Sequence, residues 1–151
     1  MAINRRINRD IKNLMTLDNS NVKLMDDKTI HCNILGPEDT IYNGGRWKII
    51  IMIPDSYPFK SPSIGFIDKI WHPNVDFQSG SVCLNVLNQS WSPIYTLEHI
   101  VSTFIPQLLT YPNADDPLNI DAAEMYINDI EKFNETAAKY INLDLDAILL
   151  D

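Results

Sequence analysis

The chain has 151 residues, a hydrophobic fraction of 45% and a formal net charge of −8. This length fits one domain spanning residues 1–151, which can bury about two-thirds of its unfolded surface, and the composition excludes a disordered chain. No apolar run approaches the roughly 18 residues that span a bilayer, and residues 2–12 are polar and basic, unlike a secretory signal. We therefore expect no membrane contact. Because the two cysteines of such a chain are typically reduced thiols, we expect it in the cytoplasm and nucleus.

The charge is distributed unevenly along the chain. Residues 1–114 hold ten acidic and ten basic residues, whereas residues 115–151 hold ten acidic and two basic ones. Nucleic-acid binding needs clustered Lys and Arg, so this balance argues against it. One basic cluster does lie near the N-terminus, where Asp10 faces Arg5, Arg6, Arg9 and Lys12. This patch predicts either a solvated helix face or a contact with an acidic protein.

The first half of the chain contains one predicted helix and a run of predicted strands. Apolar residues at spacings of four and three predict an amphipathic helix over residues 2–17, with the stripe Ile3, Ile7, Ile11 and Leu14. Strands are predicted at residues 22–25, 29–35, 47–53 and 63–66. The near-continuous apolar run of the third strand suggests burial on both faces. Short connections make an antiparallel meander the simplest topology.

The second half is predicted to be helical. Thr96 should cap a helix that continues to Leu109 and has Glu98 in its first turn. Pro106 lies inside this helix and should kink it or remove one hydrogen bond. Two more helices are predicted at residues 121–128 and 131–149, and the second makes an acidic end over about residues 131–151. A helix, a four-stranded sheet and three C-terminal helices indicate an α+β fold.

The most reactive candidate side chain is Cys83, which follows a turn-rich run that should deliver it to an irregular surface segment. A lone cysteine is usually a small buried hydrophobe. Nothing beside Cys83 favours its thiolate, because Val82 and Leu84 are apolar and the nearest histidine lies eleven residues earlier. A reactive and a structural Cys83 both remain open on these grounds. Asn74, in a proline-fixed turn, is the kind of neutral donor that stabilises an oxyanion.

The other cysteine and the histidines indicate less chemistry. Cys32 shares a strand face with Ile30 and Ile34, so we expect it to be structural. Three His and two Cys without paired spacing predict no metal site.

With these elements placed, the chain resembles a ubiquitin-conjugating enzyme over essentially its whole length. The motifs that carry the resemblance occur together in the family's order and spacing: Gly44-Gly45, Tyr57-Pro58-Phe59-Lys60-Ser61-Pro62, His72-Pro73-Asn74, Cys83-Leu84, Trp91 and Asp116-Pro117-Leu118. Within the family, residues 57–66, 104–109 and 111–113 are most similar to class H, the carrier that works with a large multi-subunit ligase.

The resemblance implies an activity and its partners. The sulfur of Cys83 takes ubiquitin from the ubiquitin-activating enzyme as a thioester, and a lysine of a substrate protein then receives it with the help of a RING-type ligase. The activating enzyme consumes the ATP, so this chain is expected to need no cofactor and no metal. The resemblance also implies that the chain acts as a monomer.

The resemblance also implies roles at the site. Asn74 stabilises the oxyanion or supports the loop that does, and Asp116 positions the lysine and accepts its proton. His72 tethers the turn, and Asn113 lines the site. One departure is Asn85, which stands where many members carry an acid two residues after the nucleophile. The loss of that charge is expected to slow unassisted transfer to lysine or to alter the choice of lysine.

Two partner surfaces follow from the resemblance by position. The ligase is expected to dock on Phe59 and on the pair Pro93 and Ile94. The activating enzyme, and ligases in turn, are expected to use the basic helix with Arg5, Arg6 and Arg9.

Three alternatives stay open at this point. A non-catalytic ubiquitin-binding relative would lack the nucleophile, so Cys83 argues against it. A carrier of a ubiquitin-like modifier would show the same motifs. A cysteine hydrolase needs a base on the thiol, and no histidine is well placed for this by sequence.

Overall fold

The computed structural model describes residues 2–141, and the side chains from residue 5 onward. The central element is a four-stranded sheet in the order β1-β2-β3-β4, and every neighbouring pair is antiparallel. Its strands are β1 (Lys23–Asp26), β2 (Thr29–Leu35), β3 (Arg46–Met52) and β4 (Ser63–Phe66). The predicted meander and α+β class are confirmed, and two of the four strands have the predicted bounds.

Strand β3 corrects one prediction, because it is not buried on both faces. Its inward residues Trp47, Ile49 and Ile51 are fully buried, whereas Lys48 and Met52 are exposed. Side chains alternate between the two faces of a strand, and here the helices cover the inner face only. The apolar residues of the outer face therefore lie on an open surface of the sheet.

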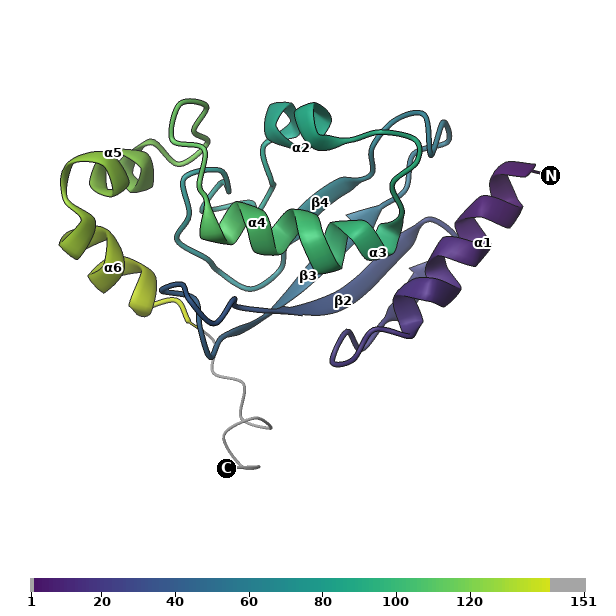
Figure 1. The fold of residues 1–151 in the computed structure, drawn as a ribbon, viewed down its shortest axis with the longest axis horizontal. Coiled ribbons are helices and arrows are strands. Elements are labelled where there is room, and N and C mark those ends of the chain that lie inside the picture. Colours follow the sequence, from purple (N-terminus) through teal and green to yellow (C-terminus); the bar gives the residue numbers. More distant parts are fainter. Residues whose placement is uncertain (1, 142–151) are drawn as a thin grey trace.

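Helix α1 (Ala2–Met15) lies at one end of the molecule (Figure 1). Ile7, Ile11 and Leu14 are buried, as the apolar spacing predicts; the side chain of Ile3 lies outside the described ones. The helix ends two residues before the predicted position. A turn follows, in which Thr16 N donates to Asn13 O and Leu17 N donates to Leu14 O.

A long helical rod runs across the inner face of the sheet (Figure 1). It consists of α3 (Leu97–His99), the π-helical turn η1 (Ile100–Phe104) and α4 (Ile105–Thr110). The predicted cap is present, since Thr96 Oγ1 accepts a hydrogen bond from His99 N at 3.2 Å. Pro106 falls in the first turn of α4, directly after η1. The irregular turn thus occurs where the proline lacks an N–H to donate.

Helix α2 (Leu84–Ser90) is an element that the sequence did not predict. It is only seven residues long and follows a run of turn residues, so its apolar periodicity is too short to recognise. It lies above the rod in Figure 1 and begins immediately after Cys83.

The C-terminal helices α5 (Ile120–Asn128) and α6 (Ile130–Ala138) lie at the end of the molecule opposite α1 (Figure 1). Helix α6 is shorter than predicted, because the chain leaves it after Ala138 in tight turns and Tyr140 then packs on Phe77, with ring centroids 5.0 Å apart. The last part of the predicted helix and of the acidic end, residues 142–151, lies outside the described residues.

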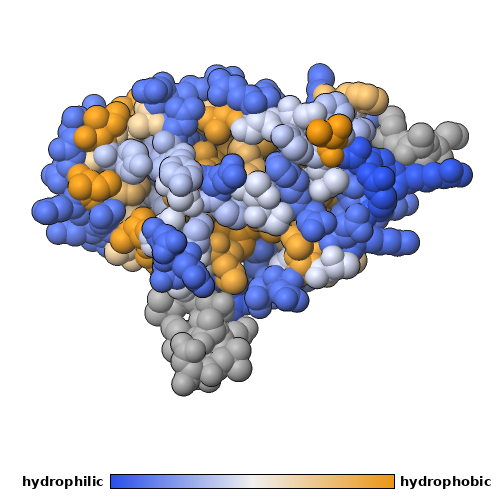
Figure 2. Space-filling view, in the orientation of Figure 1, coloured by the Kyte–Doolittle hydropathy of each residue, from blue (hydrophilic) through white to orange (hydrophobic). Residues whose placement is uncertain are grey.

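The visible surface mixes polar and apolar residues, with hydrophobic side chains over α5 and α6 (Figure 2). Those exposed on these helices are Ile120, Ile127 and Ile130. Acidic residues Asp121 and Glu124 are exposed on the same helix as Ile120. This end of the molecule is therefore both acidic and partly apolar.

Candidate active site around Cys83

A tight turn delivers Cys83 to its position. Gly80 has a φ of 79°, a left-handed conformation that favours glycine, and its carbonyl accepts a hydrogen bond from Phe66 N at 2.7 Å. The chain then forms an isolated bridge between Val75 and Val82, and Cys83 N donates to Asn74 O at 2.9 Å. The cysteine is thereby fixed against the turn that carries Asn74.

Cys83 is more enclosed than its turn-rich surroundings predict. It is only 6% exposed and it is the residue before the first turn of α2, not part of an irregular surface segment. The reason is α2 itself, which folds back directly after the cysteine, as the bond from Leu87 N to Cys83 O shows. The neighbouring residues Leu84 and Asn85 are exposed.

Asp116 is the charged group that faces the thiol. Its Oδ2 atom lies 4.0 Å from Cys83 Sγ, too far for a strong hydrogen bond. An amine nitrogen about 3 Å from this carboxylate is within reach of a carbon atom bonded to the sulfur. The pair can therefore place an amine against an acyl group carried on Cys83.

Asn74 is fully buried and all the hydrogen-bonding capacity of its Nδ2 group is used. Nδ2 donates to Asn113 O at 2.7 Å and to Asp116 O at 3.1 Å, and Oδ1 accepts from Asn113 N at 2.8 Å. An amide has two N–H donors, so none is left for an oxyanion. Of the two roles that the sequence left open, this geometry matches support of the loop that carries Asp116.

His72 is fully buried and both of its ring nitrogens have partners. Nδ1 accepts a hydrogen bond from Asn74 N at 3.0 Å, so Nε2 carries the proton and donates to Leu108 O at 2.8 Å. Burial lowers the pKa of His72 to about 4, and the bond to Leu108 only partly opposes this effect. The imidazole is therefore neutral at pH 7 and ties the turn to α4, which is the arrangement expected of a tethering residue.

Backbone bonds complete the link between the turn and the loop. Leu118 N and Asn119 N both donate to Pro73 O, at 2.9 and 3.0 Å. The main chain of Asn113 bonds to the Asn74 side chain, and its own side-chain Oδ1 accepts a hydrogen bond from Asp115 N at 3.2 Å. The structure thus brings together the predicted site residues Cys83, Asn74, Asp116, His72 and Asn113.

The predicted docking loops lie next to each other and are both exposed at their tips. Phe59 is 72% exposed and Ile94 is 80% exposed, and Pro93 is exposed beside it. Trp91 Nε1 donates to Pro58 O at 2.9 Å, which joins the two loops at their bases. The Tyr57–Pro58 bond is cis.

A model of the family described as "Ubiquitin-conjugating enzyme" matches residues 6–141. This range contains every predicted site and docking residue except Arg5. The chain belongs to the ubiquitin-conjugating enzyme family. Its resemblance to this family, first based on short motifs, therefore extends over nearly the whole sequence.

Relatives in the family are similar over most of this chain. It is 46% identical over 140 residues to the ubiquitin-conjugating enzyme E2-24 kDa of Saccharomyces cerevisiae, covering 91% of this chain and 64% of the yeast protein. It is 47% identical over 138 residues to the ubiquitin-conjugating enzyme E2 5 of Arabidopsis thaliana, covering 90% of this chain and 74% of that protein. The chain thus spans about two-thirds to three-quarters of the length of these relatives.

A solved structure shares the fold. The E2 domain of a Toxoplasma gondii ubiquitin conjugating enzyme matches with a TM-score of 0.80 and 31% identity, over 91% of this chain and 94% of that one. The helices and the antiparallel sheet are therefore those of the family.

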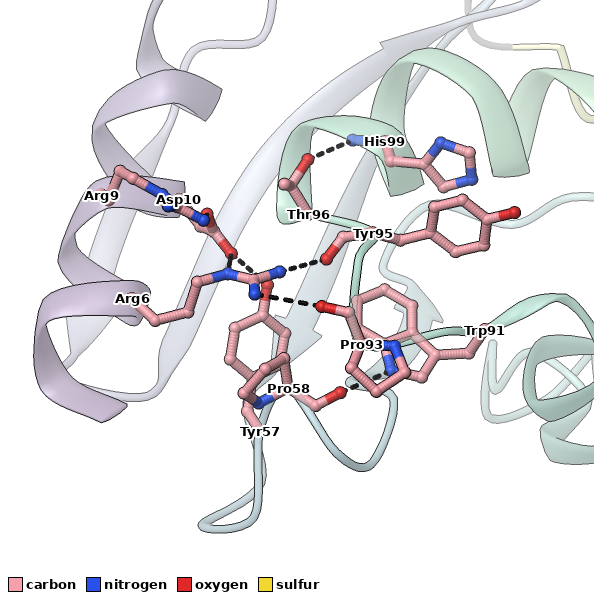
Figure 3. Close-up of polar contacts among 10 residues, drawn as sticks. All are labelled: Arg6, Arg9, Asp10, Tyr57, Pro58, Trp91, Pro93, Tyr95, Thr96 and His99. Carbon is pink, nitrogen blue, oxygen red and sulfur yellow. Dashed lines mark hydrogen bonds and ion pairs between the residues drawn. The ribbon is translucent and has the colours of Figure 1, made fainter. Parts of the chain in front are cut away.

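Within this family fold, the structure corrects the interpretation of Arg6. Arg5 and Arg9 are exposed on α1, but the Arg6 side chain is only 18% exposed. Its guanidinium binds Asp10, Pro93 O and Tyr95 O (Figure 3). Arg6 is therefore held by contacts inside the molecule, because Asp10, one helical turn later, and two carbonyl groups take up three of its five N–H donors.

The partners of Arg6 are residues that the sequence analysis did not single out as functional. Asp10 is fully buried, and Tyr57 donates its hydroxyl to the same carboxylate oxygen that Arg6 Nε contacts. The available signal was the single acid among four bases, spaced four residues after Arg6.

Two further observations concern metals and membranes. Among residues 2–141, no three His, Cys, Asp or Glu side chains are grouped so that they could hold a metal ion. Within the same part of the chain, every helix is too short or too polar to cross a bilayer.

Proposed function

We propose that this chain carries ubiquitin as a thioester on Cys83 and transfers it to a lysine of a substrate protein. The observation that carries the proposal is the position of the Cys83 thiol, 4.0 Å from the Asp116 carboxylate, in a loop arrangement that Asn74 holds together. Membership of the ubiquitin-conjugating enzyme family supplies the identity of the modifier.

The loading step is an exchange between two thiols. The Cys83 sulfur attacks the thioester carbonyl on the ubiquitin-activating enzyme, the bond between this carbonyl and the activating enzyme's sulfur breaks, and that sulfur leaves as a thiolate. One thioester replaces another, so the step needs no further energy source. The proton of the Cys83 thiol is balanced by the proton that the leaving thiolate takes up.

The transfer step needs an uncharged lysine. A free lysine amine has a pKa of about 10.4, so roughly one in 2,500 is uncharged at pH 7. A carboxylate near an ammonium group raises the ammonium pKa further, so Asp116 does not help by its charge alone. Its contribution is to orient the amine and to accept its proton once the nitrogen has begun to bond to the carbonyl carbon.

Asn74 acts through the loop that carries Asp116. Its three side-chain bonds reach only Asn113 and Asp116, and its amide is fully buried. It is therefore proposed as a positioning residue. Asn113 shares this role, and His72 fixes the turn from the other side.

Docking is proposed at the two exposed loop tips and on α1. Phe59 and Ile94 present adjacent apolar surface to a RING-type ligase, and Arg5 and Arg9 present positive charge to the activating enzyme. Because α1 is in contact with the Pro93 loop, the two partners are proposed to bind weakly and in sequence, with the ligase following the activating enzyme. Action as a monomer, and a place in the cytoplasm and nucleus, belong to the same proposal.

The geometry does not favour a cysteine hydrolase. Such an enzyme needs a base on its nucleophile, and both nitrogens of His72 are bound to Leu108 and Asn74 instead.

A loading assay tests the proposal. The chain is mixed with ubiquitin-activating enzyme, ubiquitin and ATP, and the products are separated on gels with and without thiol. We expect one ubiquitin adduct that thiol removes, a thiol-resistant ester for Cys83→Ser, and no adduct for Cys83→Ala. Cys32→Ser is the matched control, because Cys32 is 1% exposed and burial raises the pKa of its thiol to about 12. Loading of Cys83→Ala would overturn the proposal.

A further inference from the structure

A buried ionic cluster lies between α1 and the two docking loops (Figure 3). Its centre is Asp10, a carboxylate with no exposed surface. Arg6 Nε lies 2.7 Å from Asp10 Oδ2, Tyr57 donates its hydroxyl to the same oxygen, and Arg9 Nη2 lies 3.4 Å from Oδ1. Burial and the bond to Asp10 raise the pKa of the Tyr57 hydroxyl, so it remains protonated and can donate.

Arg6 extends this cluster to the second loop. Nη1 donates to Pro93 O at 3.0 Å and Nη2 donates to Tyr95 O, so the guanidinium holds the carbonyl groups on either side of Ile94. The guanidinium carbon also lies 5.5 Å from the centroid of the Tyr57 ring. One planar side chain thus contacts α1, the Tyr57 loop and the Pro93 loop at the same time.

The two loops are also joined to each other at their bases. Trp91 Nε1 donates to Pro58 O at 2.9 Å, and the ring centroids of Tyr57 and Trp91 are 5.8 Å apart. The exposed tips follow directly, since Phe59 is two residues after Tyr57 and Ile94 lies between Pro93 and Tyr95. Each exposed tip is therefore one or two residues away from a group that the cluster holds.

A buried ion pair is not needed for stability alone. Apolar side chains of similar volume often stabilise a protein core as well as a buried ion pair does, and directed bonds contribute geometric definition instead. The hydrogen bonds of Arg6 have fixed directions, so they define the distance between the two loops. An apolar contact has no such direction and would let the loops shift relative to each other. Because Asp10 is fully buried, salt screens its contact with Arg6 only weakly.

We infer that Arg6, Asp10 and Tyr57 are positioning residues for ligase docking: their cluster fixes the separation of Phe59 and Ile94, which a RING-type ligase must engage together. This inference rests on the proposed function. It also distinguishes the arginines of α1, because Arg5 and Arg9 are exposed whereas Arg6 is held inside the molecule.

The test uses two near-isosteric variants, Asp10→Asn and Tyr57→Phe, in the full chain, and Phe59→Ala as the reference for loss of the docking surface itself. The matched control is Ile11→Val, which removes one buried methyl group from the same helix without touching the cluster. Each protein is loaded with ubiquitin and discharged with increasing amounts of a RING-type ligase that stimulates the parent, and separately to free lysine without ligase. Hydrogen exchange of the backbone amides is followed over residues 56–62 and 91–96.

We expect both variants to need about five- to tenfold more ligase for half-maximal stimulation, with the maximal rate unchanged. Loading and ligase-free discharge to lysine should stay within about twofold of the parent, because Cys83 and Asp116 are not in contact with the cluster. Amide exchange should accelerate in both loops. The control should match the parent in every respect, including its response to ligase.

Four results would overturn the inference. Unchanged exchange in both loops shows that the cluster does not hold them. An unchanged ligase requirement in Asp10→Asn, when Phe59→Ala has lost stimulation, rejects the positioning role but leaves the docking surface intact. Full stimulation of Phe59→Ala rejects the docking surface itself, and with it this inference. A loss of ligase-free discharge in the variants equal to their loss of stimulation would likewise identify a general structural role.

Discussion

Asn74 is the residue for which the structure distinguishes best between the two roles that the sequence left open. Its amide makes three bonds to the loop that carries Asp116 and keeps no N–H group for a reaction intermediate. Support of a loop and direct stabilisation of an oxyanion predict different behaviour when Asn74 and Asp116 are replaced together. The distinction is therefore open to experiment.

We predict that Asn74→Ala loads ubiquitin normally but discharges it to lysine about 10- to 100-fold more slowly, because the loop and its carboxylate move relative to the sulfur. If Asn74 acts through Asp116, the double variant Asn74→Ala with Asp116→Ala should be hardly slower than Asp116→Ala alone. Single-turnover discharge to free lysine measures all three rates. Fully multiplicative losses would contradict the loop-support role and restore a direct one.

His72 makes the site sensitive to acid through stability. Its pKa is about 4 in the folded chain because burial disfavours the charged ring, whereas an unfolded histidine has a pKa of about 6.5. Between these values the unfolded chain binds a proton that the folded chain does not. The free energy of unfolding is therefore unaffected by this residue above about pH 6.5, and it decreases as the pH falls from 6.5 toward 4, by about 3 kcal/mol in all.

We predict that urea denaturation at several pH values shows this loss for the parent chain, and that His72→Gln flattens the dependence between pH 6.5 and 4. The control is His31→Gln, which replaces a histidine at a partly exposed position of β2 and leaves the buried ring of His72 in place. Hydrogen bonds from Ser79 lower the pKa of Asp76, so this carboxylate contributes its own loss only at lower pH. Equal slopes for the parent and His72→Gln would show that His72 is not the titrating group.

At the scale of elements, the turn before Cys83 has the strictest steric requirement. A Cβ atom at Gly80 would lie 1.9 Å from Phe66 O, and the residue also has a left-handed φ of 79°. Gly44 has a similar φ of 83° but nothing within 4 Å of its Cβ position. The two glycines therefore separate the cost of the backbone conformation from the cost of the clash.

We predict that Gly44→Ala lowers the free energy of unfolding by about 1 kcal/mol, the typical cost of a left-handed alanine. Gly80→Ala should lose more than about 2 kcal/mol, because the bond from Phe66 N to Gly80 O must also be distorted. Chemical denaturation of both variants checks this order. The same loss for both would contradict the packing of this turn against β4.

Elements with a clear period were predictable and the others were not. Strand β2 and helix α1 have regular apolar spacing over several turns or pleats, and the sequence places them within two residues. Helix α2 has too few residues to display a period, and Ile50 and Met52 on the outer face of β3 are apolar although both are at least partly exposed. Sequence pattern reports the chemistry of a face, but not whether another element covers it.

The site was predictable as a set of residues but not as a network. The motifs identified Cys83, Asn74 and Asp116 because their order along the chain resembles the family's. The bonds that define the role of Asn74 join residues 39 and 42 positions apart, and only the folded chain brings these together. The burial of Asp10 depends in the same way on Tyr57, 47 positions away.

On the scale of the whole molecule, the functional regions follow one another along the long axis (Figure 1). Helix α1 and the loops with Phe59 and Ile94 lie at one end, α2 with the cysteine at its start lies between, and α5 and α6 form the acidic, partly apolar end (Figure 2). A partner on the proposed docking loops would therefore bind beside α2.

The most direct test of the account is to locate ubiquitin on the freshly loaded chain. The chain is loaded with activating enzyme, ubiquitin and ATP, digested under acidic, thiol-free conditions, and analysed by mass spectrometry. The account predicts that the C-terminal residues of ubiquitin are found on the peptide that contains Cys83, and that brief thiol treatment releases them. Ubiquitin attached at Cys32, at a lysine, or at no residue would contradict it.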